Sequence, residues 1–271
     1  MKKKLIFSLM SAGILAGCSP SNIEYPSTKK VDQVDDYHGT SVADPYRWLE
    51  VDTAKAVMEW VNQQNQVTFN YLNQIEGKEG LKTELETLYN YEKYSAPRKA
   101  GDYYLFYKND GLQNQSVIYI QKGLDGEAEV LLDPNTLSED GTVTANLVSI
   151  SKDHKYATIS INQSGSDWTN FKVLELATKK FLEDEIKWAK FSGTSWYKDG
   201  FFYSSYGMPE EGTEYSAKNE FHKVYYHKLG TPQSTDELVY WNKDEPLRNF
   251  FGAVTKDQSH LIIGGSEGTY G

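Results

Sequence analysis

The chain has 271 residues, of which 39% are hydrophobic and 24% are charged, so it is long enough for one large domain or two ordinary ones. The formal net charge is -10, and no basic patch interleaved with aromatic residues is present. Because phosphate groups would be repelled, this composition argues against a nucleic-acid-binding protein. Twenty Tyr, eleven Phe and six Trp make the chain rich in aromatic residues, which favour strands.

The N-terminus is typical of a bacterial export signal. Lys2–Lys4 form a positive region, and Leu5–Ala16 form an apolar stretch that is too short to span a bilayer. The sequence Leu15–Cys18 then looks like a lipobox, in which Cys18 would carry a lipid. Cys18 is the only cysteine of the chain and has no internal disulfide partner, and lipidation explains its presence. An ordinary secretory signal with an incidental cysteine is the alternative.

These features predict a lipoprotein signal peptide at residues 1–17 and a short polar tether at 18–23. The protein is expected to be exported and lipid-anchored in the cell envelope, facing the periplasm. Ser19, rather than Asp, follows the cysteine and favours the bacterial outer membrane by analogy.

Residues 24–88 are predicted to be mainly helical. Asp44 can cap the first turn of a helix, and Pro45 suits the first helical position. Apolar residues then recur at three-to-four spacing through 53–75, and leucines continue this spacing through 81–88. Neither segment shows a cofactor signature, so a helical layer that packs on another domain is the simplest interpretation.

Beyond Tyr89 the chain consists of short β-rich runs separated by Gly, Asp and Asn, so we expect a domain boundary there. Similar runs recur on the order of every 50 residues, each with an Asp in a turn before a strand, as in a β-propeller blade. A β-sandwich, in which turns also recur, is the alternative. The four turn residues are Asp102, Asp153, Asp199 and Asp257.

The number of repeats predicts that more chain follows. Residues 89–271 hold about three blades and the beginning of a fourth, whereas propellers close with about four to eight blades. An open propeller would leave unpaired strand edges, which folded proteins avoid. We therefore expect this chain to be the truncated N-terminal part of a longer protein.

The sequence contains no pattern of a catalytic or metal site. The G-x-S-x-G elbow is absent: Ser195 comes nearest, since Gly193 precedes it, but Tyr197 stands where the second glycine is needed. None of the five histidines lies in a general-base motif, and His222 and His227 are not spaced as zinc ligands. A P-loop and a dinucleotide fingerprint are also absent. We expect no catalytic residue, no metal and no cofactor in this chain.

Several long stretches, spread over the whole mature chain, carry a specific resemblance. They are Asp35–Glu50, Asp110–Val117, Leu131–Asn135, Ser164–Trp168, Ser195–Tyr203 and Lys223–Thr231. Together they closely resemble the N-terminal part of the prolyl oligopeptidase (prolyl endopeptidase) family of serine peptidases.

The resemblance implies a two-domain oligopeptidase. One domain is an α/β-hydrolase built from both chain ends, and the other is a seven-bladed propeller that covers the active site. On that pattern, residues 24–88 belong to the hydrolase domain, and 89–271 are the first three to four blades. The expected fold is therefore mostly β: a partial seven-bladed propeller that follows a helical segment. That segment belongs to an α/β-hydrolase domain, which a missing C-terminal half completes. The Ser-Asp-His triad of such proteins lies in that half, so no residue of this chain matches it.

Two substrate-binding residues follow from the resemblance. Phe191 matches a phenylalanine that lines the substrate pocket from the propeller side; without the resemblance, an ordinary core position in a blade would be preferred. Thr269 matches a pocket-lining position that is Cys in some relatives. Ser266 falls where some relatives carry Arg, and this departure leaves that part of the subsite open.

The function implied is hydrolysis of short peptides on the carboxyl side of proline, with the propeller gating access. A proline-specific site needs an apolar, aromatic-lined slot, because pyrrolidine offers shape but no N–H. The expected partners are short proline-containing peptides and, through the lipid, a membrane; the family layout suggests a monomer. The alternative is a non-catalytic β-propeller lipoprotein that binds a peptide or protein. A complete but inactive decoy is a third, weaker interpretation.

Overall fold

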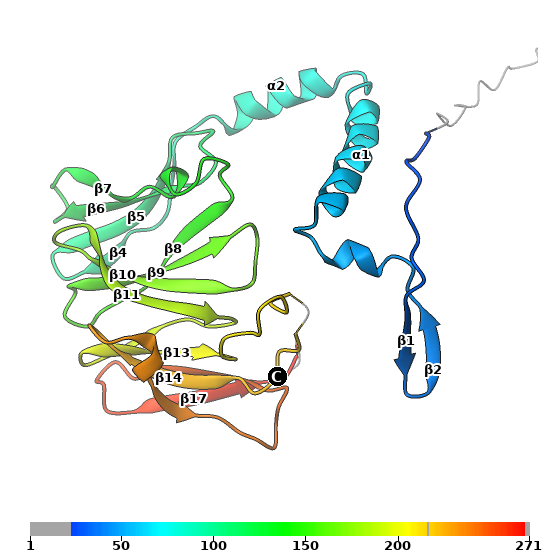
Figure 1. Cartoon of the computed structure of the whole chain (residues 1–271). Coiled ribbons are helices and arrows are strands. Elements are labelled where there is room, and N and C mark those ends of the chain that lie inside the picture. Colours follow the sequence, from blue (N-terminus) through cyan, green and yellow to red (C-terminus); the bar gives the residue numbers. More distant parts are fainter. Residues whose placement is uncertain (1–22, 216, 269–271) are drawn as a thin grey trace, which may run out of the picture. The chain divides into compact units, whose positions relative to one another are not determined.

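The computed structural model describes residues 23–215 and 217–268 (Figure 1). The chain divides between Glu84 and Leu85 into two compact units. The predicted signal peptide, Cys18 and Thr269 lie outside the described residues and stay predictions. In the described part of the chain, no helix is long and apolar enough to cross a membrane.

The first unit contains a hairpin, a short 3-10 turn and helices. Strand β1 (Val34–Tyr37) pairs antiparallel with β2 (Thr40–Ala43), and η1 (Arg47–Glu50) follows. Helix α1 (Lys55–Leu72) comes next, and α2 (Lys78–Tyr89) begins in this unit and ends in the second.

The predicted cap at Asp44 does not begin a long helix. Its carboxylate accepts a hydrogen bond from the Tyr46 backbone N–H at 3.3 Å, but only the 3-10 turn η1 follows before α1. The other oxygen of Asp44 is bound by Arg47, whose guanidinium also pairs with Asp35 of β1. The Asp-Pro-Tyr-Arg sequence thus ties the hairpin to a turn, which explains why the helix begins later than its cap residues predicted.

Two indole N–H groups fasten the extended chain that precedes β1. Trp48 donates to the backbone carbonyl of Lys29 at 2.9 Å, and Trp60 of α1 donates to the Thr28 hydroxyl at 3.0 Å. These contacts give the aromatic residues of this segment a structural role within the first unit.

The second unit is built from antiparallel strands in groups of about four. The first sheet holds β3 (Lys93–Tyr94), β4 (Arg98–Ala100), β5 (Tyr103–Asn109), β6 (Val117–Lys122) and β7 (Ala128–Leu132). The second group is β8 (Val143–Ile150), β9 (Tyr156–Gln163), β10 (Thr169–Glu175) and β11 (Lys180–Ala189). The third is β12 (Ser195–Tyr197), β13 (Gly200–Ser205), β14 (Lys223–Lys228) and β15 (Glu237–Tyr240), and β16 (Asn249–Val254) pairs with β17 (Leu261–Ser266). Short 3-10 turns, η2 (Pro134–Thr136) and η3 (Gln233–Thr235), precede β8 and β15.

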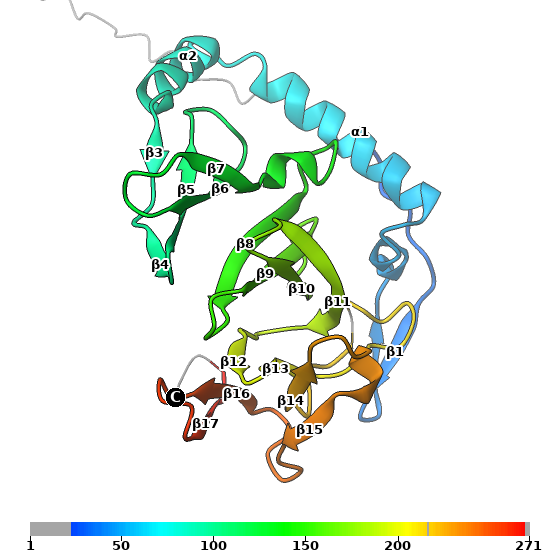
Figure 2. The same ribbon diagram turned by 90° about the vertical axis from the view of Figure 1, so that its left-hand side faces the viewer.

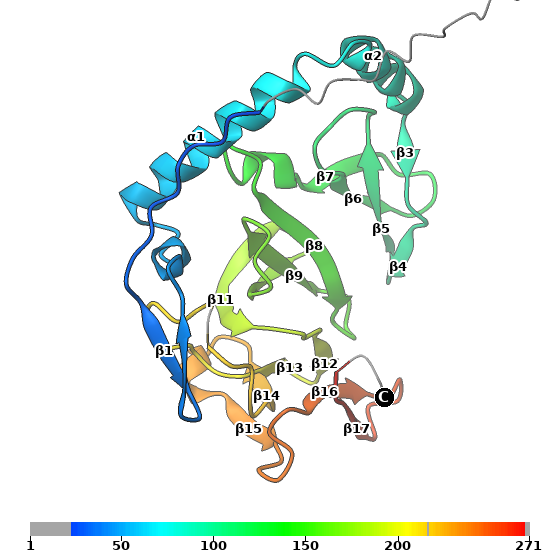
Figure 3. The same ribbon diagram turned by 90° about the vertical axis from the view of Figure 1, so that its right-hand side faces the viewer.

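The groups follow one another around an arc, with β4, β8, β12 and β16 on its inner side (Figures 2 and 3). The backbone link between the second and third groups is a single residue pair, Ala189 of β11 with Ser205 of β13. The side-chain amide of Gln233 adds to it, because it accepts from the Lys187 N–H at 3.0 Å and donates to the Lys187 carbonyl at 2.9 Å.

The apolar core lies between neighbouring groups rather than inside one layer. Leu105 and Ile118 of the first sheet are buried in one cluster with Ile159 of the second group. Phe171 and Phe201 belong to a cluster between the second and third groups, and a smaller cluster joins the third group to β16 and β17. More than two small sheets packed one after another are typical of a propeller, whereas the alternative β-sandwich consists of two sheets.

The four aspartate turns predicted from the repeats are present. They lie between β4 and β5, β8 and β9, β12 and β13, and β16 and β17. In two of them the fourth residue, His154 or Gln258, has the same left-handed φ of +59°. Asp153 and Asp257 accept hydrogen bonds from the backbone and from the hydroxyl that begins the turn, which fixes the same loop in both places.

Candidate functional site

Phe191, the predicted substrate-binding residue, lies just beyond the end of β11, in the connection to β12. Its φ of +50° falls in the left-handed region that non-glycine residues rarely adopt. Its side chain is 56% exposed, so the interpretation of Phe191 as a core residue of a blade is wrong. The position leaves the ring open to a ligand, and substrate binding by Phe191 stays a prediction.

Phe191 is supported from one side by Tyr206. The two rings meet edge to face, with centroids 6.5 Å apart and planes at 85°. Tyr206 in turn packs on the buried imidazole of His222 at 4.4 Å and donates its hydroxyl hydrogen bond to the side chain of Asn249. Two residues of the β13–β14 connection and the first residue of β16 thus hold one exposed ring in place.

His222 fixes the backbone on which Phe191 stands. The Phe250 N–H donates to Nδ1 of His222 at 2.9 Å, so Nε2 must carry the ring proton and donate to the carbonyl of Lys190 at 3.0 Å. Burial lowers the pKa of His222 below its ordinary value of 6.5. The neutral imidazole therefore joins the residue before Phe191 to strand β16.

We expect His222 to titrate below pH 6.5 in the folded protein. A proton on Nδ1 of His222 would face the backbone N–H of Phe250, so two donors would meet and the hydrogen bond would be lost. The folded state therefore disfavours protonation of His222. His222 then contributes stability above pH 6.5 that is lost as the pH falls from 6.5 through its lowered pKa. Histidine chemical shifts followed by NMR through acid pH check this. A midpoint for His222 at or above 6.5 would contradict the assigned hydrogen bonds.

Lys190 connects Phe191 to a pair of tryptophans. Its side chain is only 12% exposed, and its Nζ lies 4.9 Å from the ring centre of Trp168 and 5.6 Å from that of Phe191. The carboxylate of Asp167 is 4.0 Å away. Trp168 meets Trp188 edge to face at 5.5 Å. An aromatic surface with a cation in it therefore extends from Phe191 to Trp188.

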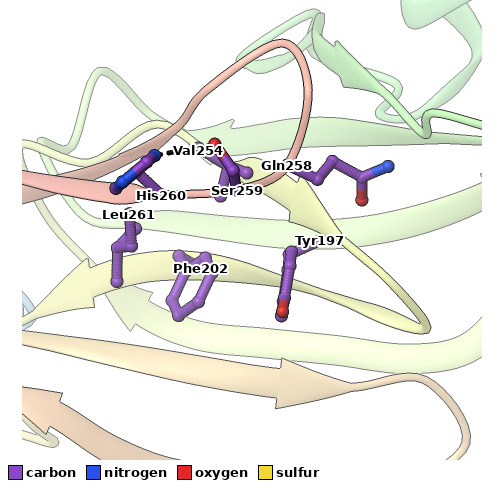
Figure 4. A pocket seen from close by; sticks show the side chains of 7 residues that line it. All are labelled: Tyr197, Phe202, Val254, Gln258, Ser259, His260 and Leu261. Carbon is purple, nitrogen blue, oxygen red and sulfur yellow. Dashed lines mark hydrogen bonds between the residues drawn. The ribbon is translucent and has the colours of Figure 1, made fainter.

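A cavity of about 150 Å³ lies between β12–β13 and the β16–β17 hairpin (Figure 4). Ser259 and His260 line it, and the Ser259 hydroxyl lies 2.7 Å from Nδ1 of His260 and 2.8 Å from an oxygen of Asp257. In a catalytic triad the histidine stands between the serine and the acid. Here the serine stands between the other two, within a tight turn, so this cluster is a turn-stabilising network and not a triad.

A buried cluster of one histidine and two aspartates in the second unit was not predicted. Nδ1 of His227 lies 2.8 Å from Asp236, and its Nε2 lies 3.1 Å from Asp184 of β11. Tyr203 donates to the second oxygen of Asp236 at 2.8 Å. Burial alone lowers the pKa of His227, but the hydrogen bonds and charges of the two carboxylates outweigh it and raise that pKa above 6.5.

This cluster pins the second group of strands to the third. Asp184 belongs to β11, whereas His227 lies on β14 and Asp236 just before β15. Asp184 also accepts from the Gly230 N–H at 2.5 Å. No sequence motif marks these residues, because the partners lie far apart along the chain; the burial of a histidine in an Asp-rich protein is visible only in the fold.

In residues 23–215 and 217–268, no group of three or more His, Cys, Asp or Glu side chains could hold a metal ion. The chemistry that the described site offers is binding: an exposed phenylalanine, two indoles and a lysine held at one end of the sheets. Sequence reasoning named Phe191 but missed the supporting roles of Lys190, Tyr206 and His222. Of these three residues, only Lys190 could have been identified from the sequence, because it directly precedes Phe191.

Comparison with known proteins identifies the family. The family model described as prolyl oligopeptidase, N-terminal β-propeller domain, matches residues 25–270. The chain belongs to the prolyl oligopeptidase family. The resemblance seen in the sequence is thereby confirmed, as is a mostly β fold of the N-terminal propeller type.

The curated relatives are longer than this chain. A prolyl endopeptidase of Elizabethkingia meningoseptica is 46% identical over 275 residues, and that of Elizabethkingia miricola is 44% identical over 275 residues. Each alignment covers 100% of this chain and 39% of the relative. A dual function macrocyclase-peptidase POPB of Galerina marginata is 34% identical, over 90% of this chain and 37% of the relative.

Solved structures of the prolyl oligopeptidase family match the same part of the chain. Prolyl oligopeptidase B from Galerina marginata, bound to a 35mer hydrolysis and macrocyclization substrate, has a TM-score of 0.73 at 30% identity. The match covers 90% of this chain and 37% of that one. A prolyl endopeptidase from a study of inter-domain dynamics has a TM-score of 0.60 at 34% identity, over 90% of this chain and 35% of the other.

Proposed function

We propose that this chain is the N-terminal portion of a serine peptidase that hydrolyses short peptides on the carboxyl side of proline. The observation that carries the proposal is the similarity of the whole chain to prolyl endopeptidases, at 44% and 46% identity. The chain spans 39% of those proteins, so the catalytic serine, aspartate and histidine are proposed to lie in sequence that follows residue 271.

The helices of residues 24–88 are proposed to complete an α/β-hydrolase domain. Leu81, Leu85 and Leu88 recur along one side of α2, and they are 59%, 46% and 62% exposed in the structure. Three partly exposed leucines along one helix cost free energy in water, roughly half of the 1.5–3 kcal/mol that full burial of an exposed side chain contributes. A hydrolase domain would cover them, and this supports the proposal that the segment belongs to such a domain.

Residues 89–271 are proposed to be the first blades of a seven-bladed propeller that gates access to the active site. The arc of successive four-stranded groups supports this, because a propeller needs further groups to close. A propeller lid limits entry to short peptides and helps to exclude water from the reaction. On this proposal Phe191 and Thr269 contact the substrate from the propeller side, while an oxyanion hole and triad in the other domain carry out acyl transfer.

The proposed location is the bacterial cell envelope, with the protein anchored by a lipid on Cys18 after removal of residues 1–17. The positive start, the apolar stretch and the lipobox-like ending support this location. The proposed partners are short proline-containing peptides, and the protein is proposed to act as a monomer without a cofactor.

The test uses the native protein purified from the producing cells. We expect a mass more than twice the 30.8 kDa of this chain, labelling by diisopropyl fluorophosphate, and cleavage of a Gly-Pro chromogenic peptide. The 271-residue chain alone, as the control, is expected to show neither labelling nor cleavage. A native protein of about 30.8 kDa that is not labelled would sink the peptidase proposal and favour a peptide-binding propeller lipoprotein.

A further inference from the structure

A cavity of about 440 Å³ lies beside the turn between β9 and β10 and along β11. Trp168 and Trp188 line it, together with the polar side chains of Gln163, Asn170 and Glu185. It is the largest of the described cavities. Lys190 touches Trp168 on one side and Phe191 on the other, so the cavity continues the aromatic surface around Phe191.

Trp188 reaches this cavity through a β-bulge. Thr169 pairs with Ala189 and Phe171 pairs with Ile186, so two residues of β11 stand opposite a single residue of β10. Trp188 lies in this bulge with a φ of +60°, a conformation that costs an L-residue roughly 1–2 kcal/mol. Bulges redirect side chains and are common beside functional sites, and such strain persists only where the surroundings enforce it.

The two indoles form the walls of a corner. Their planes meet at 86°, and the indole N–H of Trp168 donates a hydrogen bond to the backbone carbonyl of Glu214 at 2.7 Å. The side-chain amides of Gln163 and Asn170 line the same cavity, and neither has a hydrogen-bond partner among the described residues. Flat apolar walls with free amides beside them suit a ligand that has an apolar ring and carbonyl oxygens.

Every charged side chain around the cavity lies within 4.0 Å of an opposite charge, three ammonium groups facing two carboxylates. Glu185 lies 3.6 Å from the ammonium of Lys172 and 3.4 Å from that of Lys187. The ammonium of Lys190 rests on the ring of Trp168, near Asp167. Because each of these charges has a counterpart, a neutral ligand fits this cavity better than an anion or a cation.

We propose that the cavity of Trp168 and Trp188 binds a proline-rich stretch of an extended peptide at a distance from the residue that is cleaved. A polyproline II helix is preformed, lacks backbone N–H groups at its prolines, and presents flat pyrrolidine faces and free carbonyls. Aromatic-lined grooves recognise such segments in other folds. The pyrrolidine rings lie against Trp168 and Trp188, and Gln163 and Asn170 donate to the carbonyls. The inference rests on the proposed function in one respect: the proline-rich stretch is taken to be part of a peptide substrate that extends beyond the cleaved bond.

The test measures binding of acetyl-hexaproline-amide to the native protein, after treatment with diisopropyl fluorophosphate, by isothermal titration calorimetry. We expect saturable binding that Trp188→Gly weakens at least tenfold, because the indole is lost. Glycine accepts the left-handed backbone at this position, so the bulge is kept. Circular dichroism verifies that the variant is folded. Trp168→Leu gives a second variant with the same expected loss, in case Trp188→Gly fails to fold.

The matched control is Tyr104→Leu, which alters an aromatic cavity of about 370 Å³ on the first sheet. This variant is expected to bind hexaproline as the parent chain does. A peptide of alternating glycine and serine is expected not to bind. Absence of hexaproline binding, equal binding by the Trp188 variant, or equal weakening by the Tyr104 variant each overturns the proposal.

The outcome is separable from that of the proposed function. If the native protein cleaves no prolyl peptide while hexaproline binding depends on Trp188, the peptidase proposal fails and the binding site stands. If the native protein cleaves after proline but hexaproline does not bind, only the additional site is lost.

Discussion

Replacing His227 with alanine is expected to lower the free energy of unfolding of the chain by about 3–5 kcal/mol, the usual cost of breaking a buried ion pair. The side chains of His227, Asp184 and Asp236 are 0%, 6% and 1% exposed, so water cannot replace the lost contacts. Without the imidazole, two buried carboxylates are left without their cation. Urea unfolding followed by circular dichroism measures the change.

The control is His260→Ala, which removes one exposed hydrogen bond in the β16–β17 turn and is expected to cost about 1 kcal/mol, the usual contribution of a single hydrogen bond. A second check is the pH dependence. Because the pKa of His227 is raised in the fold, its contribution is complete below pH 6.5 and is lost as the pH rises through the raised pKa. A loss from His227→Ala no larger than that from His260→Ala would show that the cluster does not hold the sheets together.

Phe191→Ala in the native protein is expected to reduce kcat/KM for a Gly-Pro chromogenic peptide about 10- to 100-fold. A phenyl ring that a substrate buries contributes roughly 1.5–3 kcal/mol, and each 1.36 kcal/mol is tenfold in rate. The loss should lie mainly in KM, since the ring binds the substrate without taking part in the chemistry. The folded structure should tolerate the change, because Phe191 is 56% exposed.

The matched control is Phe181→Ala, on β11, the strand that precedes Phe191, and also partly exposed. It removes an identical ring away from the Phe191 cluster, and kcat/KM is expected to stay within about twofold of the parent value, as for an ordinary surface substitution. If Phe191→Ala leaves KM unchanged, the ring is not part of the substrate pocket, and the role implied by the resemblance is wrong.

The sequence predicted those parts of the fold that depend on local patterns. The aspartate turns recur because a hydroxyl, an Asp and a left-handed residue close the loop within five or six positions, as at 151–156 and 255–260. The helix predicted from the apolar spacing that starts at residue 53 is α1, which begins at Lys55. In each case neighbouring residues determine the outcome.

The remaining features depend on contacts between distant residues. Asp44 reads as a helix cap in the sequence, but Arg47 draws its carboxylate into an ion-pair cluster with Asp35. The pairing of His227 with Asp184 joins residues 43 positions apart. Nothing near Trp188 in the sequence marks a bulge, because the extra residue exists only relative to the register with β10. Local periodicity contains no information about such partners.

The placement of the apolar clusters between groups of strands has a consequence for how the second unit comes apart. The β8–β11 group shares one cluster with the sheet before it and another with the group after it. Each interface contributes separately to the stability of such an array, so release of the β8–β11 group requires the loss of two interfaces. The amides of β9 and β10 are therefore expected to be among the slowest of this unit to exchange with solvent.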